Sequence, residues 1–232
     1  MNVHNSPSPR SPAASRPSPA SGTGYAVKEC FLTLQGEGVQ AGSRAVFLRF
    51  AGCNLWSGRE QDRASAQCNF CDTDFVGTDG EGGGKFGTPD ELAAHVEGLW
   101  GAGEERRLVV ITGGEPMLQL DERLIAALHE RGFRVAAETN GTLPATPGLD
   151  WICVSPKAGT DVVQRSGDEL KLVWPQKGIE PGELESWRFD YFLVQPMDCA
   201  ERDKAVRAAI ELVMNRPKWR LTLQAHKVVG LA

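Results

Sequence analysis

The chain has 232 residues, of which 41% are hydrophobic and 24% charged, and its formal net charge is -5 at pH 7. This composition is typical of a globular domain, and the length suits one domain with a substantial core better than two large ones. The negative charge gives no basic footprint for nucleic acid, and no apolar run approaches the roughly 18 residues of a membrane span. The start of the sequence lacks the apolar stretch of a signal peptide. We therefore expect a cytoplasmic protein without nucleic-acid or membrane partners.

Residues 1–22 are almost all Ser, Pro, Ala, Arg and Asn. Such a segment cannot bury enough apolar surface to order itself, so we expect a disordered tail followed by one folded domain over residues 23–232. Strands are predicted over residues 25–34 and 44–50, separated by a glycine-rich turn. A helix is predicted over 88–100, because Thr88 can cap it, Pro89 suits its first turn and Glu91 completes a capping box.

Short apolar strands and amphipathic helices alternate after that. A second helix carries Leu120, Leu124, Ala127 and Leu128 on one face and ends at Gly132. A third helix, over 200–214, carries the apolar stripe Val206, Ile210 and Val213. Further strands are predicted over residues 107–112, 133–139, 149–155, 169–174, 189–195 and 219–224.

This alternation predicts an α/β fold with a mostly parallel sheet. Only three good helices serve six or seven strands, and an eight-fold barrel needs more chain. We therefore predict a shortened, incomplete barrel with about six core parallel strands and three main helices.

Three cysteines, Cys53, Cys68 and Cys71, follow the 44–50 strand at a Cys-x14-Cys-x2-Cys spacing. Six cysteines in a reducing compartment are better explained as metal ligands or buried apolar side chains than as disulfides. Thiolates suit zinc, copper(I) or an iron–sulfur cluster, and three of them leave one position open on a zinc or on one iron of a four-iron cluster. No histidine lies within 20 residues of the run. The chemistry alone leaves a cluster, zinc and mere packing open.

The other three cysteines, Cys30, Cys153 and Cys199, lie singly in strand or helix-edge patterns and are predicted to be small apolar fillers. Polar segments follow four of the predicted strands, namely "GGEP", "TNGT", "SPK" and "QPMD". Each could be a simple turn. Ligands gather at the carboxyl ends of strands in parallel sheets, so the four together predict a binding edge beside the cysteines.

The segment "FLRFAGCNLWSGREQDRASAQCNFCDTDF", followed by "VVITGGEPMLQ", resembles the radical S-adenosylmethionine enzymes. Their usual spacing is Cys-x3-Cys-x2-Cys, and this sequence departs from it in the first gap. A polar surface excursion there is tolerable because a longer loop costs little closure entropy. Within the superfamily, "LTLQGEG", "CDTDF", "ITGGEP", "ETNGT", "VSPK", "LKLV", "QPMD" and "LQAHKVVG" occur in order over about residues 25–232 and resemble the 7-carboxy-7-deazaguanine synthases.

The resemblance implies that residues 23–232 are a catalytic domain holding a 4Fe-4S cluster, S-adenosylmethionine and Mg2+. The cluster would be bound by the three spaced cysteines, and magnesium by Thr73 and Asp72. The implied cofactor contacts are Phe70, Gly113, Gly114, Glu115, Glu138, Asn140, Ser155, Lys157 and Gln195. Within that set the glycines and Glu115 would meet the amino group, Glu138 and Asn140 the ribose, and Ser155 and Lys157 the carboxylate.

The implied substrate contacts are Leu34, Gln35, Gly36, Glu37, Gly38, Arg49, Thr112, His226 and Ala232. Glu37 would accept from the N–H groups of a pterin, and Arg49 would bind its carboxylate. Plainer explanations stay open. Glu138 and Lys157 could be solvated surface charges. Arg49 could belong to a structural ion pair, and His226 could be merely packed or solvated. The remaining four could be simple turn contacts, namely Glu37, Gln195, Asp72 and Thr73.

The implied activity is the Mg-dependent ring contraction of 6-carboxy-5,6,7,8-tetrahydropterin to 7-carboxy-7-deazaguanine with loss of ammonia, in queuosine and 7-deazapurine biosynthesis. Hydrogen abstraction by the 5′-deoxyadenosyl radical leaves no catalytic side chain to name. A flavodoxin-like or other electron donor and a second copy in a homodimer are the implied partners. Two alternatives stay open, a different radical S-adenosylmethionine enzyme such as a glycyl-radical activase, and a zinc-stabilised interaction module that performs no chemistry.

Overall fold

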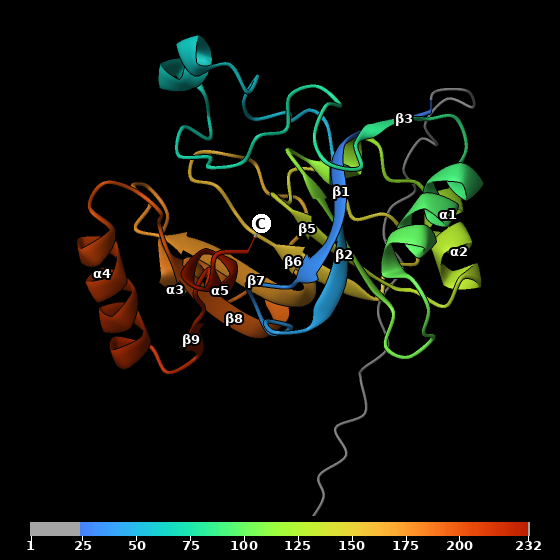
Figure 1. Ribbon diagram of the computed structural model, residues 1–232. Helices are drawn as coiled ribbons and strands as arrows, with labels where there is room; N and C mark the ends of the chain where they lie inside the picture. The colour runs from blue at the N-terminus through green and yellow to red at the C-terminus, as the bar shows by residue number, and fades with distance from the viewer. Residues whose placement is uncertain (1–23, 232) are drawn as a thin grey trace, which may run out of the picture.

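One curved sheet forms the centre of the computed structural model, which describes residues 24–231 (Figure 1). Its strands lie in the order β3-β1-β2-β4-β5-β6-β7-β8-β9. β1 pairs antiparallel with β2 and β3, and the pairs from β2 to β9 are parallel. The strands are β1 (Tyr25–Leu34), β2 (Arg44–Phe50), β3 (Gly84–Phe86), β4 (Leu108–Gly113), β5 (Arg134–Thr139), β6 (Trp151–Val154), β7 (Ser166–Trp174), β8 (Arg188–Pro196) and β9 (Trp219–Leu221). The open order confirms the predicted incomplete barrel.

Helices cover the outer face of the sheet in two groups (Figure 1). α1 (Pro89–Trp100) and α2 (Glu122–Glu130) pack at one end and share the larger apolar core with β1, β2, β4 and β5. α3 (Pro181–Leu184) and α4 (Arg202–Asn215) pack at the other end against β7, β8 and β9. The predicted cap of the first helix is confirmed, since the Thr88 side chain accepts from the Glu91 N–H. The remaining elements are α5 (Ala225–Val229) and the 3-10 helices η1 (Glu60–Ser65) and η2 (Pro116–Leu118).

The apolar stripe predicted for the third helix is wrong in part, because Val213 packs against the core and Val206 is half-buried, but Ile210 is exposed. α4 buries Ala205, Ala209 and Leu212, whereas Ile210 is 45% exposed. The sheet beneath the helix carries Trp219, whose ring lies edge-on to Phe192 with centroids 5.6 Å apart. These rings fill much of the interior, so two of the three side chains that α4 buries are alanines, and Ile210 lies outside this contact face.

The position of Cys199 is a second correction. This cysteine is exposed in the turn before α4, whereas Cys30 and Cys153 are buried as predicted. The short β3 and α5 were not predicted. The expected strand over 219–224 ends at Leu221, and the Thr222 N–H then donates to the Val194 carbonyl.

Two predictions fall outside the part of the chain that the structure describes, the tail over 1–22 and the assignment of Ala232. Within residues 24–231, no helix combines the length and the apolar character that crossing a bilayer requires.

Strand alternation decides which side chains reach the interior of the half-barrel. On β7, Leu170 and Leu172 face the helices and belong to the apolar core. The intervening Lys171 therefore points to the opposite face, as does Val173, and both line a cavity there. The sheet thus presents polar groups inward at the carboxyl ends of its strands.

Candidate active site

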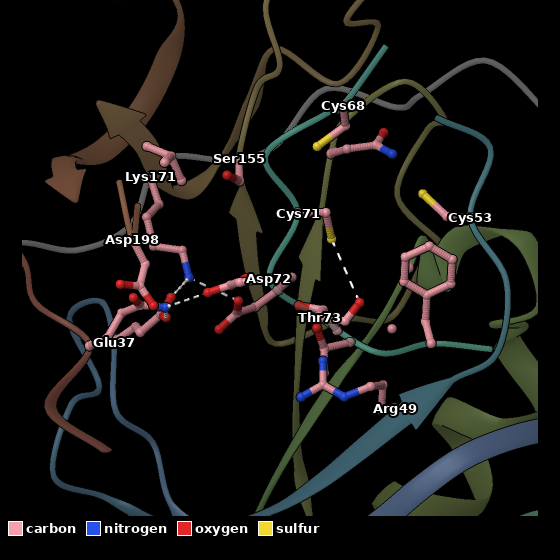
Figure 2. Close-up of a pocket in the computed structure, with 18 of the residues that line it drawn as sticks. Glu37, Arg49, Cys53, Cys68, Cys71, Asp72, Thr73, Ser155, Lys171 and Asp198 are labelled. Atoms are coloured by element: carbon pink, nitrogen blue, oxygen red, sulfur yellow. Dashed lines mark hydrogen bonds and ion pairs between the residues drawn. The ribbon is translucent and has the colours of Figure 1, made fainter. Parts of the chain in front are cut away.

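A cavity of about 390 Å³ opens at the carboxyl ends of the parallel strands. The β1–β2 turn, the cysteine loop, the ends of β4 to β8 and the C-terminal segment surround it (Figure 2). The site residues predicted from the sequence that line it are Leu34, Gln35, Glu37, Arg49, Cys53, Cys68, Phe70, Cys71, Asp72, Thr73, Thr112, Gly113, Gly114, Glu138, Asn140, Ser155, Lys157, Gln195 and His226. The structure therefore brings together segments as far apart in the sequence as Leu34 and His226.

The three spaced cysteines share one side of this cavity, and Figure 2 shows their sulfur atoms around a common space. The Cys68 thiol hydrogen-bonds to Cys71, which lowers the pKa of Cys71 to about 6 and raises that of Cys68. Burial is the main cause that raises the pKa of Cys53. The nearby Lys157 ammonium favours the thiolate forms of Cys68 and Cys71.

This donor set fits a polynuclear cluster better than a single metal ion. Within residues 24–231, no group of three His, Cys, Asp or Glu side chains is placed to hold one metal ion. A structural zinc site needs ligands that converge on a single point. Three thiols that line one cavity suit a 4Fe-4S cluster with one iron left open.

The excursion between Cys53 and Cys68 braces the cysteine loop. The Arg63 guanidinium lies 4.1 Å from the Trp56 ring centroid and donates to the carbonyls of Asn69 (3.1 Å) and Cys71 (3.0 Å). Trp56 in turn packs edge-on against Phe75. The sequence analysis treated this segment only as a tolerable insertion. The signal available in the sequence was Trp56, an aromatic residue in a mostly polar run, together with Arg63, a cation that can stack on it.

The glycines of "GGEP" lie against the start of the cysteine loop. A Cβ atom on Gly114 would lie 2.4 Å from the Gly52 carbonyl oxygen and 2.5 Å from the Cys53 Cβ, so only glycine fits there. The Glu115 N–H donates to the same Gly52 carbonyl. Gly113 and Gly114 thus reach the cavity beside Cys53, and their role toward the cofactor's amino group stays a prediction.

The Glu115 carboxylate lies beneath the cavity and does not line it, which differs from the expected contact with the amino group. It is fully buried and accepts from Met117 N (2.9 Å), Thr139 Oγ1 (2.8 Å) and Asn140 N (2.8 Å). Burial raises its pKa, and these three bonds oppose that rise. The side chain therefore ties the "GGEP" turn to the end of β5.

Lys157 and Gln195 offer a cation and an acceptor to the cavity. Lys157 Nζ donates to both the carbonyl and the hydroxyl of Ser155 at 2.7 Å, and burial lowers its pKa. Gln195 is buried, and its Oε1 atom finds no hydrogen-bond partner among the described residues. An orphaned buried acceptor is costly without a ligand donor, so its place in the cavity wall fits a binding site.

The "LQGEG" turn is held by the C-terminal segment. The Gly38 N–H donates to Thr222 Oγ1 (2.9 Å), and the Ala225 N–H donates to the Gly36 carbonyl (2.8 Å). A Cβ atom on Gly36 would lie 2.1 Å from His226 Nδ1, which explains the glycine. Gly36 and Gly38 themselves do not line the cavity, so their implied substrate contacts remain predictions.

A buried lysine that the sequence analysis missed joins two of the predicted carboxylates. Lys171 Nζ contacts Glu37 (Figure 2). It also lies 2.9 Å from Glu138 Oε2. Arg49 pairs through Nε with Glu29 at 2.6 Å, so the structural ion pair considered above exists while Arg49 also lines the cavity. The assignments of Arg49 to the substrate and of Glu138 to the ribose stay predictions.

Lys227 also lines the cavity and was missed, although the "HK" motif contains it. Its ammonium bridges Asp72 Oδ2 (2.7 Å) and Asp198 Oδ2 (2.5 Å). Gln224 Nε2 donates to Asp72 as well, at 3.3 Å. The C-terminal segment is thereby fastened to the cysteine loop, and Asp72 is occupied by these partners, so its role toward magnesium stays a prediction.

Comparisons with known proteins identify the family. Residues 61–169 match the model of the radical SAM superfamily. The chain is 62% identical over 207 residues to the 7-carboxy-7-deazaguanine synthase of Caulobacter vibrioides, across 89% of this chain and 99% of the relative. The chain belongs to the 7-carboxy-7-deazaguanine synthase family.

Two further relatives agree with membership of this synthase family. The Burkholderia multivorans 7-carboxy-7-deazaguanine synthase is 59% identical, with 89% of this chain and 99% of the relative covered. The crystal structure of QueE from Escherichia coli superposes with a TM-score of 0.65 at 29% identity, covering 88% of this chain and 95% of that one. As a radical SAM synthase, the chain belongs with enzymes that use a 4Fe-4S cluster and S-adenosylmethionine, and the three cavity thiols fit that cluster.

Proposed function

We propose that the chain converts 6-carboxy-5,6,7,8-tetrahydropterin to 7-carboxy-7-deazaguanine by a Mg-dependent ring contraction with loss of ammonia, in queuosine or 7-deazapurine biosynthesis. The observation that carries the proposal is one cavity shared by the three cluster thiols and the charged "LQGEG" turn, in a chain 62% identical to a 7-carboxy-7-deazaguanine synthase. When bound, the cluster and S-adenosylmethionine supply the radical chemistry that removes a hydrogen atom from the substrate. The protein supplies placement, charge pairing and exclusion of water.

The chain's residues on the cluster side suit the amino-acid end of the cofactor. The Gly113 and Gly114 backbone can approach a ligand closely because no Cβ atom stands in the way. Lys157, next to Ser155, is a cation for the cofactor's carboxylate. The unpartnered Gln195 oxygen supports a further cofactor contact.

The residues on the other side suit a flat heterocycle that is rich in N–H donors and carries one carboxylate. Glu37 and Glu138 lie together around Lys171, so we favour the substrate's N–H edge rather than the ribose as the partner of Glu138. Arg49 is the candidate for the substrate carboxylate. Thr73 lines the cavity beside Cys71 and is the candidate protein ligand for magnesium, an ion that keeps several waters and binds few protein oxygens.

The remaining partners are also proposals. A flavodoxin-like or other one-electron donor must reduce the cluster, and we propose a cytoplasmic homodimer by analogy with the family. Exposed apolar side chains near the C-terminal end, including Leu223, Val228 and Val229, support a surface that a second copy covers. Light scattering of the purified protein measures the oligomeric state directly.

Anaerobic reconstitution tests the function. We expect brown protein with about four irons per chain. Supplied with the carboxytetrahydropterin, S-adenosylmethionine, Mg2+ and dithionite, it should form 7-carboxy-7-deazaguanine, detected by mass spectrometry, and less of it without Mg2+. An intact cluster without this product would show that the substrate is wrong. Colourless, zinc-containing protein would overturn the cluster itself.

A further inference from the structure

Lys171 lies at the centre of the substrate side of the cavity. It comes from β7, faces the interior of the half-barrel and has a side chain that is only 4% exposed. Its ammonium contacts Glu37 from the β1–β2 turn and Glu138 from the end of β5. One lysine therefore joins two carboxylates that are about a hundred residues apart in the sequence.

The two carboxylates are held in the same way. Each gives its Oε2 atom to Lys171. Each also accepts at Oε1 from a glutamine amide at 3.0 Å, Glu138 from Gln35 and Glu37 from Gln224. Both carboxylates line the cavity. A carboxylate offers about four lone-pair sites, so each retains acceptor capacity for a ligand while its orientation is fixed.

Burial alone would raise the pKa of Glu138, but the Lys171 ammonium beside it lowers that pKa. Burial alone would lower the pKa of Lys171, but Glu138 and Glu37 outweigh burial and raise it well above the ordinary lysine value. Glu169, which is buried nearby and accepts from the Val39 N–H, adds a third carboxylate. Without the ammonium, carboxylates this close together would favour binding a shared proton at neutral pH.

A shared proton would change what the pair can recognise. A protonated carboxyl group donates through its O–H, whereas an ionised one only accepts. The pyrimidine ring of a reduced pterin presents an amino group and ring N–H groups along one edge, and these need acceptors. The lysine thus matters for binding although its own donors face the two glutamates.

We propose that Lys171 is a positioning residue, which holds Glu37 and Glu138 as one aligned, negatively charged pair of acceptors for the N–H edge of the substrate. This inference rests on the proposed function. It assigns the specificity of that edge to three residues from three separate elements of the sheet.

Binding measured without turnover tests the proposal. Reconstituted holoenzyme with S-adenosylmethionine and Mg2+, but no reductant, is titrated with the carboxytetrahydropterin in a calorimeter between pH 6 and 9. We expect Lys171→Met to bind about ten- to a hundredfold more weakly at pH 7, the size of a lost charged hydrogen bond. The deficit should shrink as the pH rises, because the shared proton is then lost. Lys171→Arg should retain most of the affinity.

Two further variants separate positioning from folding. Arg107→Met removes another largely buried cation, which pairs with Glu97 at the amino end of β4, and should leave substrate binding unchanged at every pH. Lys171→Met combined with Glu37→Gln leaves Glu138 as the only carboxylate of the pair. It should therefore bind weakly without the pH dependence, and it keeps the test available if Lys171→Met alone fails to fold.

The outcomes are distinct. Three results would overturn the inference. The first is normal affinity in Lys171→Met with an intact cluster. The others are a binding deficit that is the same at all pH values, or a pH dependence of binding that persists in the double variant. If the wild-type holoenzyme neither binds nor converts this pterin, the proposed function fails instead, and the comparison among variants shows which of the two is wrong.

Discussion

Replacing Glu115 with glutamine removes one acceptor from a buried junction of three segments. The carboxylate joins the "GGEP" turn, η2 and the end of β5 through bonds from Met117 N, Thr139 Oγ1 and Asn140 N. Glutamine has nearly the same shape but only one acceptor atom. If its oxygen replaces Oε1, its amide faces the Asn140 N–H, and if it replaces Oε2, the amide faces the Met117 N–H.

The cost follows from this mismatch. A buried donor left without its acceptor costs about 1–3 kcal/mol, and glutamine leaves at least one such donor in either orientation. Burial raises the pKa of Glu115, so the charged carboxylate carries a desolvation cost that glutamine avoids. We therefore expect a loss in the lower half of that range, and a melting temperature reduced by roughly 2–8 °C, since about 1 kcal/mol corresponds to 2–4 °C at this chain length.

Thermal unfolding of cluster-loaded protein, followed by circular dichroism without oxygen, measures this loss. Glu122→Gln is the matched control, because Glu122 is exposed in the first turn of α2. Its melting temperature should equal that of the wild type. Equal melting temperatures for the two variants would refute the argument that the Glu115 bonds hold the floor of the cavity together.

Three other changes test the cluster side and the C-terminal segment. Alanine in place of any cavity cysteine should abolish bound iron and sulfide, whereas Cys199→Ala should keep both, and a four-iron cluster surviving in a cavity variant would contradict the ligand assignment. Arg63→Ala should weaken the contacts that hold the cysteine loop by about 1–2 kcal/mol and speed cluster loss to a chelator roughly five- to thirtyfold. Arg59 is an exposed neighbour in the same excursion, so Arg59→Ala should not change this rate. Equal rates of cluster loss in the two variants would show that the Arg63 contacts do not stabilise the loop. Burial alone would raise the pKa of Asp72, but Lys227 lowers it, and burial would lower the pKa of Lys227, but Asp198 and Asp72 raise it. The bridge therefore stabilises above the ordinary pKa of Asp and below that of Lys, and is lost as pH falls through the folded-state pKa of Asp72 or rises through that of Lys227. Lys227→Met should then speed hydrogen exchange over 224–231 at pH 7 by up to about fivefold, the limit for partly exposed pairs, and this effect should shrink as the pH falls below the ordinary pKa of Asp. An effect that stays the same as the pH falls would show that the ion pair does not hold the segment.

The mostly parallel sheet and the positions of most of its strands were predictable from apolar periodicity and from the spacing of strands and helices. The buried strand before "GGEP" has five successive buried residues, which is the pattern of a parallel strand covered on both faces. β7 begins at Ser166 instead of 169, because Ser166 and Gly167 pair with β8 although neither is a strong strand former. The face of α4 was predicted only in part, because the stripe was drawn through Val206, Ile210 and Val213, whereas close packing buries Ala205, Ala209 and Leu212.

The site was predictable wherever a short motif carries it, and not where its parts meet only in the folded chain. The "GGEP", "SPK" and cysteine segments can each be recognised from a few neighbouring residues in the sequence. The partnership of Lys171 with Glu37 spans 134 residues and depends on which face of β7 turns inward. In sequence, "ELKLV" resembles a half-exposed strand, because alternating charges usually face solvent.

Two lysines of the same interior show why partners, rather than residue type, decide function. Lys171 has two carboxylate partners, so its charge is already neutralised and it has little to offer an incoming anion. Lys157 bonds only to uncharged Ser155 oxygens and makes no ion pair within residues 24–231. Burial lowers the pKa of Lys157, because an ammonium shielded from water is costly unless an anion approaches, and the adjacent thiols and the proposed carboxylate of the cofactor are such anions. We therefore expect Lys157 to bind an anionic ligand, whereas Lys171 is proposed to organise the protein's own acceptors.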